Sequence, residues 1–161
     1  MMKKISVLLV IILISLLFGC SREAKFGVGE FADRINKDFD KQITENSVSL
    51  EKDDGKNRIY CKIDDFLLVL YLGNNNNICG VAMMLPVEEK NKISLFFDDF
   101  TQCVSVFTNT SYSDAKSTLN ECGISSESIK FTDSNKISTV GKFKYSVITN
   151  EMSVTLFCER V

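Results

Sequence analysis

The segment FLLVLYL, Phe66–Leu72, is an unbroken apolar run with a turn signal at each end. Asp64-Asp65 precedes it and Gly73 follows it, and both residue types favour turns. A short apolar run bounded in this way predicts a buried strand. Because the run contains no charged residue, we expect a central strand that is covered on both faces of a sheet.

Strand signals lie on both sides of this run. Apolar residues at positions 59, 61 and 63 alternate with residues that favour solvent, which predicts a half-buried strand. Val48 and Leu50 indicate a shorter strand before it, across a turn at Asp54-Gly55. A further strand from Ile78 to Leu85 is ended by Pro86. Together these segments predict an antiparallel meander.

The C-terminal part also predicts strands. Ile129 and Phe131 are expected to begin them, and positions 137–140 to continue them. Alternating apolar residues at 143–147 and again at 152–158 predict a terminal hairpin. We expect Asn150-Glu151 to be its two-residue turn.

Three helices are expected. Apolar residues recur at helical spacing from Val28 to Ile43, which predicts an amphipathic helix of about 14–16 residues. A second helix covers positions 93–107. Ser111 with Asp114 resembles an N-terminal cap of a third helix, and Gly123 is placed to end it.

The order of elements defines the expected fold class. A helix followed by strands, then helices followed by strands, predicts an α+β fold with an antiparallel sheet and helices packed on one face. The two halves share a helix-then-meander order, which suggests a pseudo-repeat.

The first twenty residues have a separate pattern. Two lysines, Lys3 and Lys4, precede an apolar run from residue 5 to residue 18. As a helix this run would span about 21 Å, short of the ~30 Å core of a bilayer. A short apolar run behind a cationic tip is typical of a cleaved export signal. An uncleaved membrane anchor and an ordinary secretory signal are the alternatives.

The run ends in Leu17-Phe18-Gly19-Cys20, and the leader resembles the signal peptide and lipobox of bacterial lipoproteins. The resemblance implies that a diacylglyceryl group is attached to the Cys20 sulfur and that residues 1–19 are removed. Residues 20–27 would then be a lipidated cysteine with a short tether, and residues 28–161 a single globular domain. We therefore expect a domain outside the cytoplasm, anchored to a bacterial membrane through Cys20.

The composition argues against several classes of function. The chain has a net charge of −2, and loss of the two leader lysines would leave −4. This mild acidity argues against nucleic-acid binding, which needs a basic face. The sequence has no histidine, the commonest general base and a common zinc ligand. We identify no catalytic residue, no metal-ligand set and no cofactor motif.

Five cysteines would remain in the mature chain besides the lipidated one: Cys61, Cys79, Cys103, Cys122 and Cys158. Export favours disulfides, whereas buried reduced cysteine packs as a small apolar residue, and both alternatives stay open. Cys61 and Cys79 are expected on strands that flank a third one, which is too far apart for a bond. Cys103 and Cys122 could face each other across two helices.

Two pairs of adjacent carboxylates are candidates for ion binding or acid–base chemistry. Asp64-Asp65 lies in an expected turn, and Asp98-Asp99 is expected on the polar side of the second helix. Adjacent residues on a helix do not face each other, so solvated side chains are the simpler interpretation. Asn74–Asn77 could offer amides to a sugar or peptide, although its composition also suits a plain loop.

We therefore expect a lipid-anchored, non-catalytic binding or interaction domain. Its partner would be a protein, a peptide or a cell-wall component. An exported enzyme that uses carboxylates or a thiolate is one alternative, and it predicts a concave pocket with convergent titratable groups. A structural or inhibitor protein of the envelope is another, and it predicts a large exposed apolar patch on a sheet face.

Overall fold

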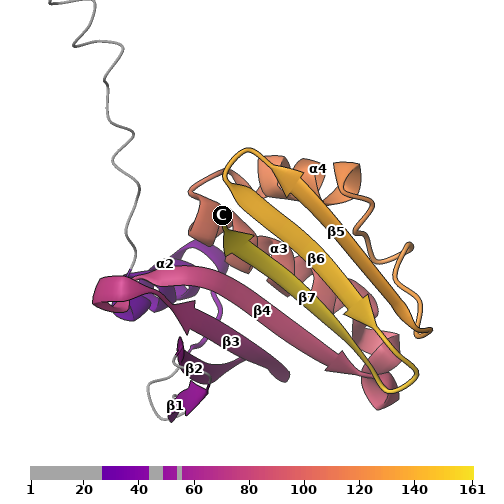
Figure 1. Ribbon diagram of the computed structural model, residues 1–161, viewed down its shortest axis with the longest axis horizontal. Helices are drawn as coiled ribbons and strands as arrows, with labels where there is room; N and C mark the ends of the chain where they lie inside the picture. Colours follow the sequence, from indigo (N-terminus) through magenta and orange to yellow (C-terminus); the bar gives the residue numbers. More distant parts are fainter. Residues whose placement is uncertain (1–26, 44–48, 54–55) are drawn as a thin grey trace, which may run out of the picture.

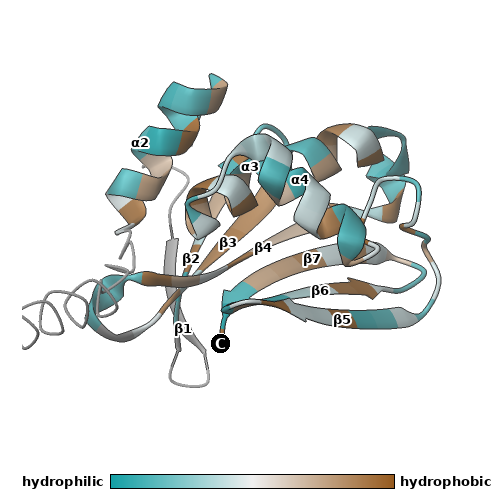
Figure 2. Ribbon diagram, turned by 90° about the horizontal axis from the view of Figure 1, so that it is seen from above, coloured by the Kyte–Doolittle hydropathy of each residue, from teal (hydrophilic) through white to brown (hydrophobic). Residues whose placement is uncertain are grey.

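The computed structural model describes residues 27–43, 49–53 and 56–161, so the leader with Leu17, Phe18, Gly19 and Cys20 lies outside the described residues. A seven-stranded antiparallel sheet forms the centre of the molecule. The helices lie on one face of this sheet, as Figures 1 and 2 show. The α+β fold with helices on one face is therefore confirmed.

The elements follow one another in this order: α2 (Val28–Phe39), β1 (Ser49–Asp53), β2 (Lys56–Ile63), β3 (Phe66–Leu72), η2 (Asn74–Asn76), β4 (Ile78–Pro86), η3 (Val87–Lys92), α3 (Ile93–Thr108), α4 (Tyr112–Glu121), β5 (Ser134–Val140), β6 (Phe143–Thr149) and β7 (Ser153–Arg160).

The sheet consists of two meanders that meet at their last strands. In space the strands are ordered β1-β2-β3-β4-β7-β6-β5, so β4 of the first meander pairs with β7 of the second. The β4–β7 pairing runs from Gly80 opposite Glu159 to Pro86 opposite Ser153. The expected helix-then-meander order is therefore present in both halves, and the halves share one continuous sheet.

Side chains alternate between the two faces of every central strand. In β3, residues 66, 68, 70 and 72 are buried, whereas residues 67, 69 and 71 are only partly buried. We call the helix-covered side the inner face and the other side the open face. The expectation that Phe66–Leu72 is covered on both faces was wrong, because no helix of the described chain packs on the open face (Figure 2).

Helix α3 covers the inner face. Eleven of its sixteen residues are buried, because the sheet lies on one side of it and α2 and α4 pack on others. Phe96 is fully buried on this helix and packs edge-to-face against Phe66 of β3, with ring centroids 5.3 Å apart. Such aromatic pairs stabilise a core beyond their buried area.

The helix ends depart in part from the expectation. Helix α2 has twelve residues and stops at Asp40, which adopts a left-handed conformation, so the predicted extension to Ile43 was wrong. Ile43 is nevertheless buried. Ser111 caps α4 as predicted, since its hydroxyl accepts a hydrogen bond from the backbone N–H of Asp114. Gly123 follows this helix with a φ of +66°, as a C-terminal glycine does.

Two expectations in the C-terminal half were also wrong. Ile129 is buried and Phe131 packs against the core, but neither lies in a strand, and β5 begins only at Ser134. The β6–β7 turn is displaced from the expected Asn150-Glu151, because the backbone N–H of Asn150 donates to the Ser153 carbonyl and so encloses Glu151 and Met152. Met152 therefore lies in the turn and is 76% exposed.

Four cysteines are buried with free thiols: Cys61, Cys103, Cys122 and Cys158. The Cys103–Cys122 bond considered from the sequence is therefore absent from the structure. The reason is that Cys103 interacts with Cys61 of β2, whereas Cys122 lies near Tyr145 and Cys158 of the other meander. Burial raises the pKa of the Cys61 thiol to about 12 and that of Cys158 further.

The cysteines should therefore differ in reactivity. We expect iodoacetamide to alkylate the partly exposed Cys79 of the native protein, and to reach the four buried thiols only after unfolding. Peptide mass spectrometry before and after denaturation measures this. Modification of a buried thiol as fast as Cys79, or recovery of Cys103 joined to Cys122, would contradict the assignment.

Candidate functional site

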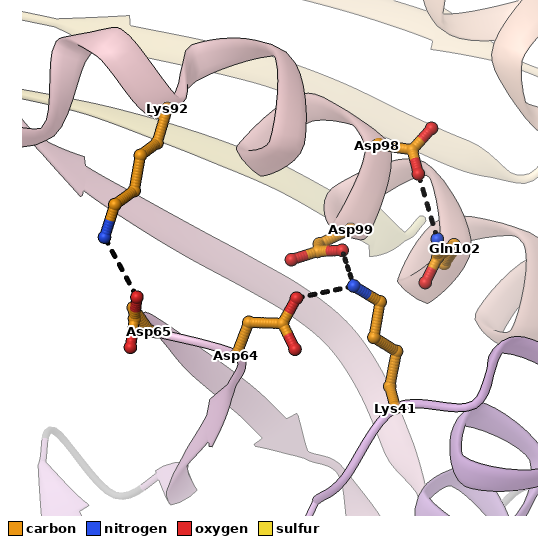
Figure 3. A network of polar contacts seen from close by, with 7 residues as sticks. All are labelled: Lys41, Asp64, Asp65, Lys92, Asp98, Asp99 and Gln102. Atoms are coloured by element: carbon orange, nitrogen blue, oxygen red, sulfur yellow. Dashed lines mark hydrogen bonds and ion pairs between the residues drawn. The ribbon is translucent and has the colours of Figure 1, made fainter.

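A cluster of charges joins the two carboxylate pairs that the sequence singled out. Asp64 comes from the turn between β2 and β3, Asp99 from α3, and Lys41 from the segment after α2. The Lys41 Nζ lies 2.5 Å from Asp64 Oδ2 and 2.9 Å from Asp99 Oδ1 (Figure 3). One ammonium group therefore holds three separate segments together.

Local geometry places each of these side chains. Asp64 has a φ of 49°, a left-handed conformation that aspartate tolerates better than most residues, and this lets the hairpin turn tightly. Asp99 has no exposed surface, because α3 turns this position toward the core. The expectation that Asp98-Asp99 lies on a solvated helix face was therefore wrong for Asp99.

Burial dominates the electrostatics of this cluster. It raises the pKa of Asp99 to about 6, although the Lys41 ammonium opposes the shift. Partial burial alone would lower the pKa of Lys41, but the carboxylates of Asp64 and Asp99 more than offset this and raise it. Asp99 Oδ2 has no hydrogen-bond partner among the described residues. At neutral pH the cluster is thus an ion pair in which the buried Asp99 carboxylate has lost its water and keeps one oxygen without a hydrogen bond.

The neighbouring polar contacts extend the cluster along α3. Asp98 accepts hydrogen bonds from Gln102 Nε2, at 3.0 Å, and from the Tyr112 hydroxyl of α4. Lys92 reaches the exposed Asp65 at 2.9 Å, which links the β2–β3 turn to η3 (Figure 3). These contacts fix helices to a hairpin turn. Within the described ranges, no group of three or more His, Cys, Asp and Glu residues is placed to hold a metal ion.

A polar groove lies beside this cluster, between the start of α3, helix α4 and the segment 125–127. Its volume is about 830 Å³, and its lining includes Ser94, Leu95, Asp98, Lys116, Asn120 and Glu127. Asp98 lines the groove, but Asp99 and Lys41 do not. The carboxylate with the raised pKa therefore does not face the concave surface next to it.

The open face of the sheet carries a different kind of surface. Strand pairing aligns its side chains in rows across the strands, and the central row runs from β2 to β5. This row consists of Tyr60, Val69, Ala82, Phe157, Ser146 and Ile137. The adjacent row adds Leu67, Met84 and Ile148. Ile137 is 56% and Ile148 is 42% exposed, so part of this apolar surface is accessible.

A hollow of about 280 Å³ lies in the open face, where small residues stand between large ones. Gly80 is at its floor, and a Cβ there would come within 3.2 Å of the Glu159 Cβ. The Tyr71 and Phe157 rings flank it, with centroids 6.4 Å apart. Lys144 and Glu159 form an ion pair of 2.5 Å at its border. The hollow thus combines aromatic walls with a charged rim.

The structure locates the remaining sequence candidates as well. The Asn74–Asn77 segment forms the short η2 helix and its end, and it lines none of the hollows described above. Sequence reasoning missed Lys41 as the partner of the carboxylates, and it did not identify which residues form the open face. The signal for an outward apolar side chain in β6 was Ile148, which lies between the buried Val147 and Thr149.

No protein-family model, curated protein or solved structure matches this chain. Among the described helices, none combines the length and apolar character needed to cross a membrane.

The raised pKa of Asp99 predicts a pH dependence of stability. Between about pH 4 and pH 6 the folded state retains a proton on Asp99 that the unfolded state has lost, so stability falls as pH rises through this window. Over this window the raised pKa of Asp99 changes the free energy of unfolding by at most about 3 kcal/mol, because the pKa differs by roughly two units between the folded and unfolded states. In D99N this step should be absent.

Urea unfolding of the wild type and D99N at several pH values measures the effect. Other carboxylates, such as Asp65 with its lowered pKa, titrate in both proteins and cancel in the difference. If the free energy of unfolding changes with pH in the same way for the two proteins from pH 4 to pH 7, Asp99 has an ordinary pKa.

Proposed function

We propose that this protein is a lipid-anchored lipoprotein of the bacterial cell envelope, and that its folded domain binds a protein or peptide partner through the open face. The anchor rests on the lipobox-like Leu17-Phe18-Gly19-Cys20 after a short apolar run. The lipid would hold the domain outside the cytoplasm, where partners arrive by diffusion along or toward the membrane.

The single observation behind the binding surface is the one-sided cover of the sheet. Helices cover the inner face (Figure 2), while the open face has a largely apolar row from Tyr60 to Ile137 that is interrupted by Ser146. Exposed apolar side chains that gather on one face are typical of an interaction site, and Ile137 and Ile148 are exposed here. Aromatic residues, here Tyr71 and Phe157, are also the types enriched at such sites.

The charged border suits recognition of a partner as well. Arg58 lies over the Tyr71 ring, 5.3 Å from its centroid, and Lys144 pairs with Glu159 at 2.5 Å. An apolar centre with a polar rim is the usual anatomy of a protein interface. The polar groove near α4 lacks this combination, because side chains such as Asp98 there already bond within the protein.

The anchor predicts a specific covalent state. Mass spectrometry of protein isolated from membranes should give Cys20 with a diacylglyceryl group as the first residue, and C20S should leave the membrane fraction or keep its leader. Retention of Met1 through Gly19, or an unmodified Cys20 in the native protein, would overturn this part of the proposal.

The binding surface predicts site-dependent crosslinking in cells. A photo-crosslinking amino acid at Ile148 should give a discrete adduct with a partner, and I137K in the same protein should remove that adduct because the charge disrupts the apolar row. Leu95 is the matched control, since it is also 42% exposed but lies on α3 beside the polar groove. Equal adducts from both positions, or adducts from Leu95 alone, would move the site away from the open face.

A further inference from the structure

Strand β5 is an edge of the sheet with unused hydrogen-bonding capacity. Among the described strands it pairs only with β6, on one side. The backbone N–H and C=O groups of an antiparallel strand point alternately to its two sides. About half of the backbone polar groups of Ser134–Val140 therefore point away from the sheet, on the side where Figure 1 shows no strand beside β5.

This edge is regular over its whole length. Its pairing with β6 runs without a register shift from Ser134 opposite Thr149 to Val140 opposite Phe143. Six of its seven residues are exposed, and none is a proline. Proteins often protect such edges with bulges, prolines, very short strands or inward-pointing charges, and of these β5 has only Lys136 on its inner side. A straight edge of this length can accept another strand.

Hollows lie on both faces next to this edge. On the open face, Asn135 and Ile137 of β5 border the 280 Å³ hollow. On the inner side, Ser134 and Lys136 border a second hollow of about 220 Å³. Since the side chains of a strand alternate between faces, a strand added to β5 would direct its odd residues to one hollow and its even residues to the other.

The two hollows differ in chemistry. The open-face hollow offers apolar side chains, including the exposed Ile137 and Ile148. The inner hollow is lined by two lysines, Lys130 and Lys136, and by no carboxylate. The first therefore suits an apolar side chain and the second an acidic one.

We propose that β5 binds an extended segment of another protein as an added antiparallel or parallel strand, and that this segment alternates apolar with acidic residues. This deepens the proposed function and depends on it, because the segment would extend the same open face. Main-chain hydrogen bonds to β5 would supply affinity, and the two hollows would supply sequence preference.

A second copy of the chain fits this edge less well. Antiparallel pairing of two β5 strands about a two-fold axis places the inner faces of both copies on the same side. Lys130 and Lys136 of one copy would then meet the same lysines of the other, and β5 itself has no acidic residue to compensate. Like charges in this arrangement disfavour the pairing.

The test uses two capped, fluorescein-labelled peptides, VEVEVEV and VKVKVKV, with the full-length protein purified in detergent. Fluorescence anisotropy at low salt should show binding of the glutamate peptide and at least tenfold weaker binding of the lysine peptide. Hydrogen exchange of the complex should show new protection of amides in β5, since its outward N–H groups become bonded.

Charge reversal checks the role of the inner hollow. K136E should weaken binding of the glutamate peptide about tenfold or more and strengthen that of the lysine peptide. K37E is the matched control, because Lys37 is an exposed lysine on α2, a helix that lies far from β5 in Figure 1. It should leave both affinities unchanged, and thermal melts of both variants would confirm that they are folded.

The outcomes separate this inference from the proposed function. Binding without new protection of β5, or failure of both peptides to bind, overturns strand addition. Crosslinking from Ile148 still tests separately whether a partner binds the open face. Protection of β5 without peptide, together with a dimer in analytical ultracentrifugation, would identify a second copy as the occupant and overturn the stated chemistry. Equal binding of both peptides would overturn the acidic preference.

Discussion

The burial of one face of the sheet by α3 is the constraint on which the rest of the structure depends. Side chains alternate along every strand, so a single cover suffices to bury one set from both meanders. Helix α3 provides that cover, and eleven of its sixteen residues are buried, seven of them apolar. Helices α2 and α4 then pack around α3. The opposite set of side chains has no helix over it in the described chain, so the helix cover and the proposed binding surface follow from the same alternation.

The charge cluster is a consequence of the same helix. A helix enclosed on several sides must also bury its polar residues, and each needs a partner. Thr101 and Ser105 satisfy their hydroxyls on the helix itself, by donating to the carbonyls of Phe97 and Gln102. A carboxylate cannot donate in this way when ionised, so Asp99 needs a cation from elsewhere, and Lys41 supplies it. The cluster thereby ties the end of α2 to the β2–β3 turn, which is a structural role.

Much of the fold could be predicted from local patterns. The alternation of Ile59, Cys61 and Ile63, the Ser111 cap and the helix-then-strand order all depend on neighbours in sequence, and these predictions were confirmed. What failed depends on contacts between distant segments. Phe66–Leu72 is apolar throughout, yet only its position relative to α3 decides that one face stays open. The meeting of Asp64 with Asp99 through Lys41 has no local signal, because three segments must first assemble.

The pairing of β4 with β7 has a kinetic consequence. Gly80 pairs with Glu159, so the contact that unites the halves spans about half of the chain. Contacts of such high order slow folding, because the intervening chain must lose its freedom before they form. During synthesis, the edge of β4 that pairs with β7 remains open until β7 has emerged. The nascent polypeptide therefore has a long interval of vulnerability to mispairing, in which a chaperone has its greatest effect.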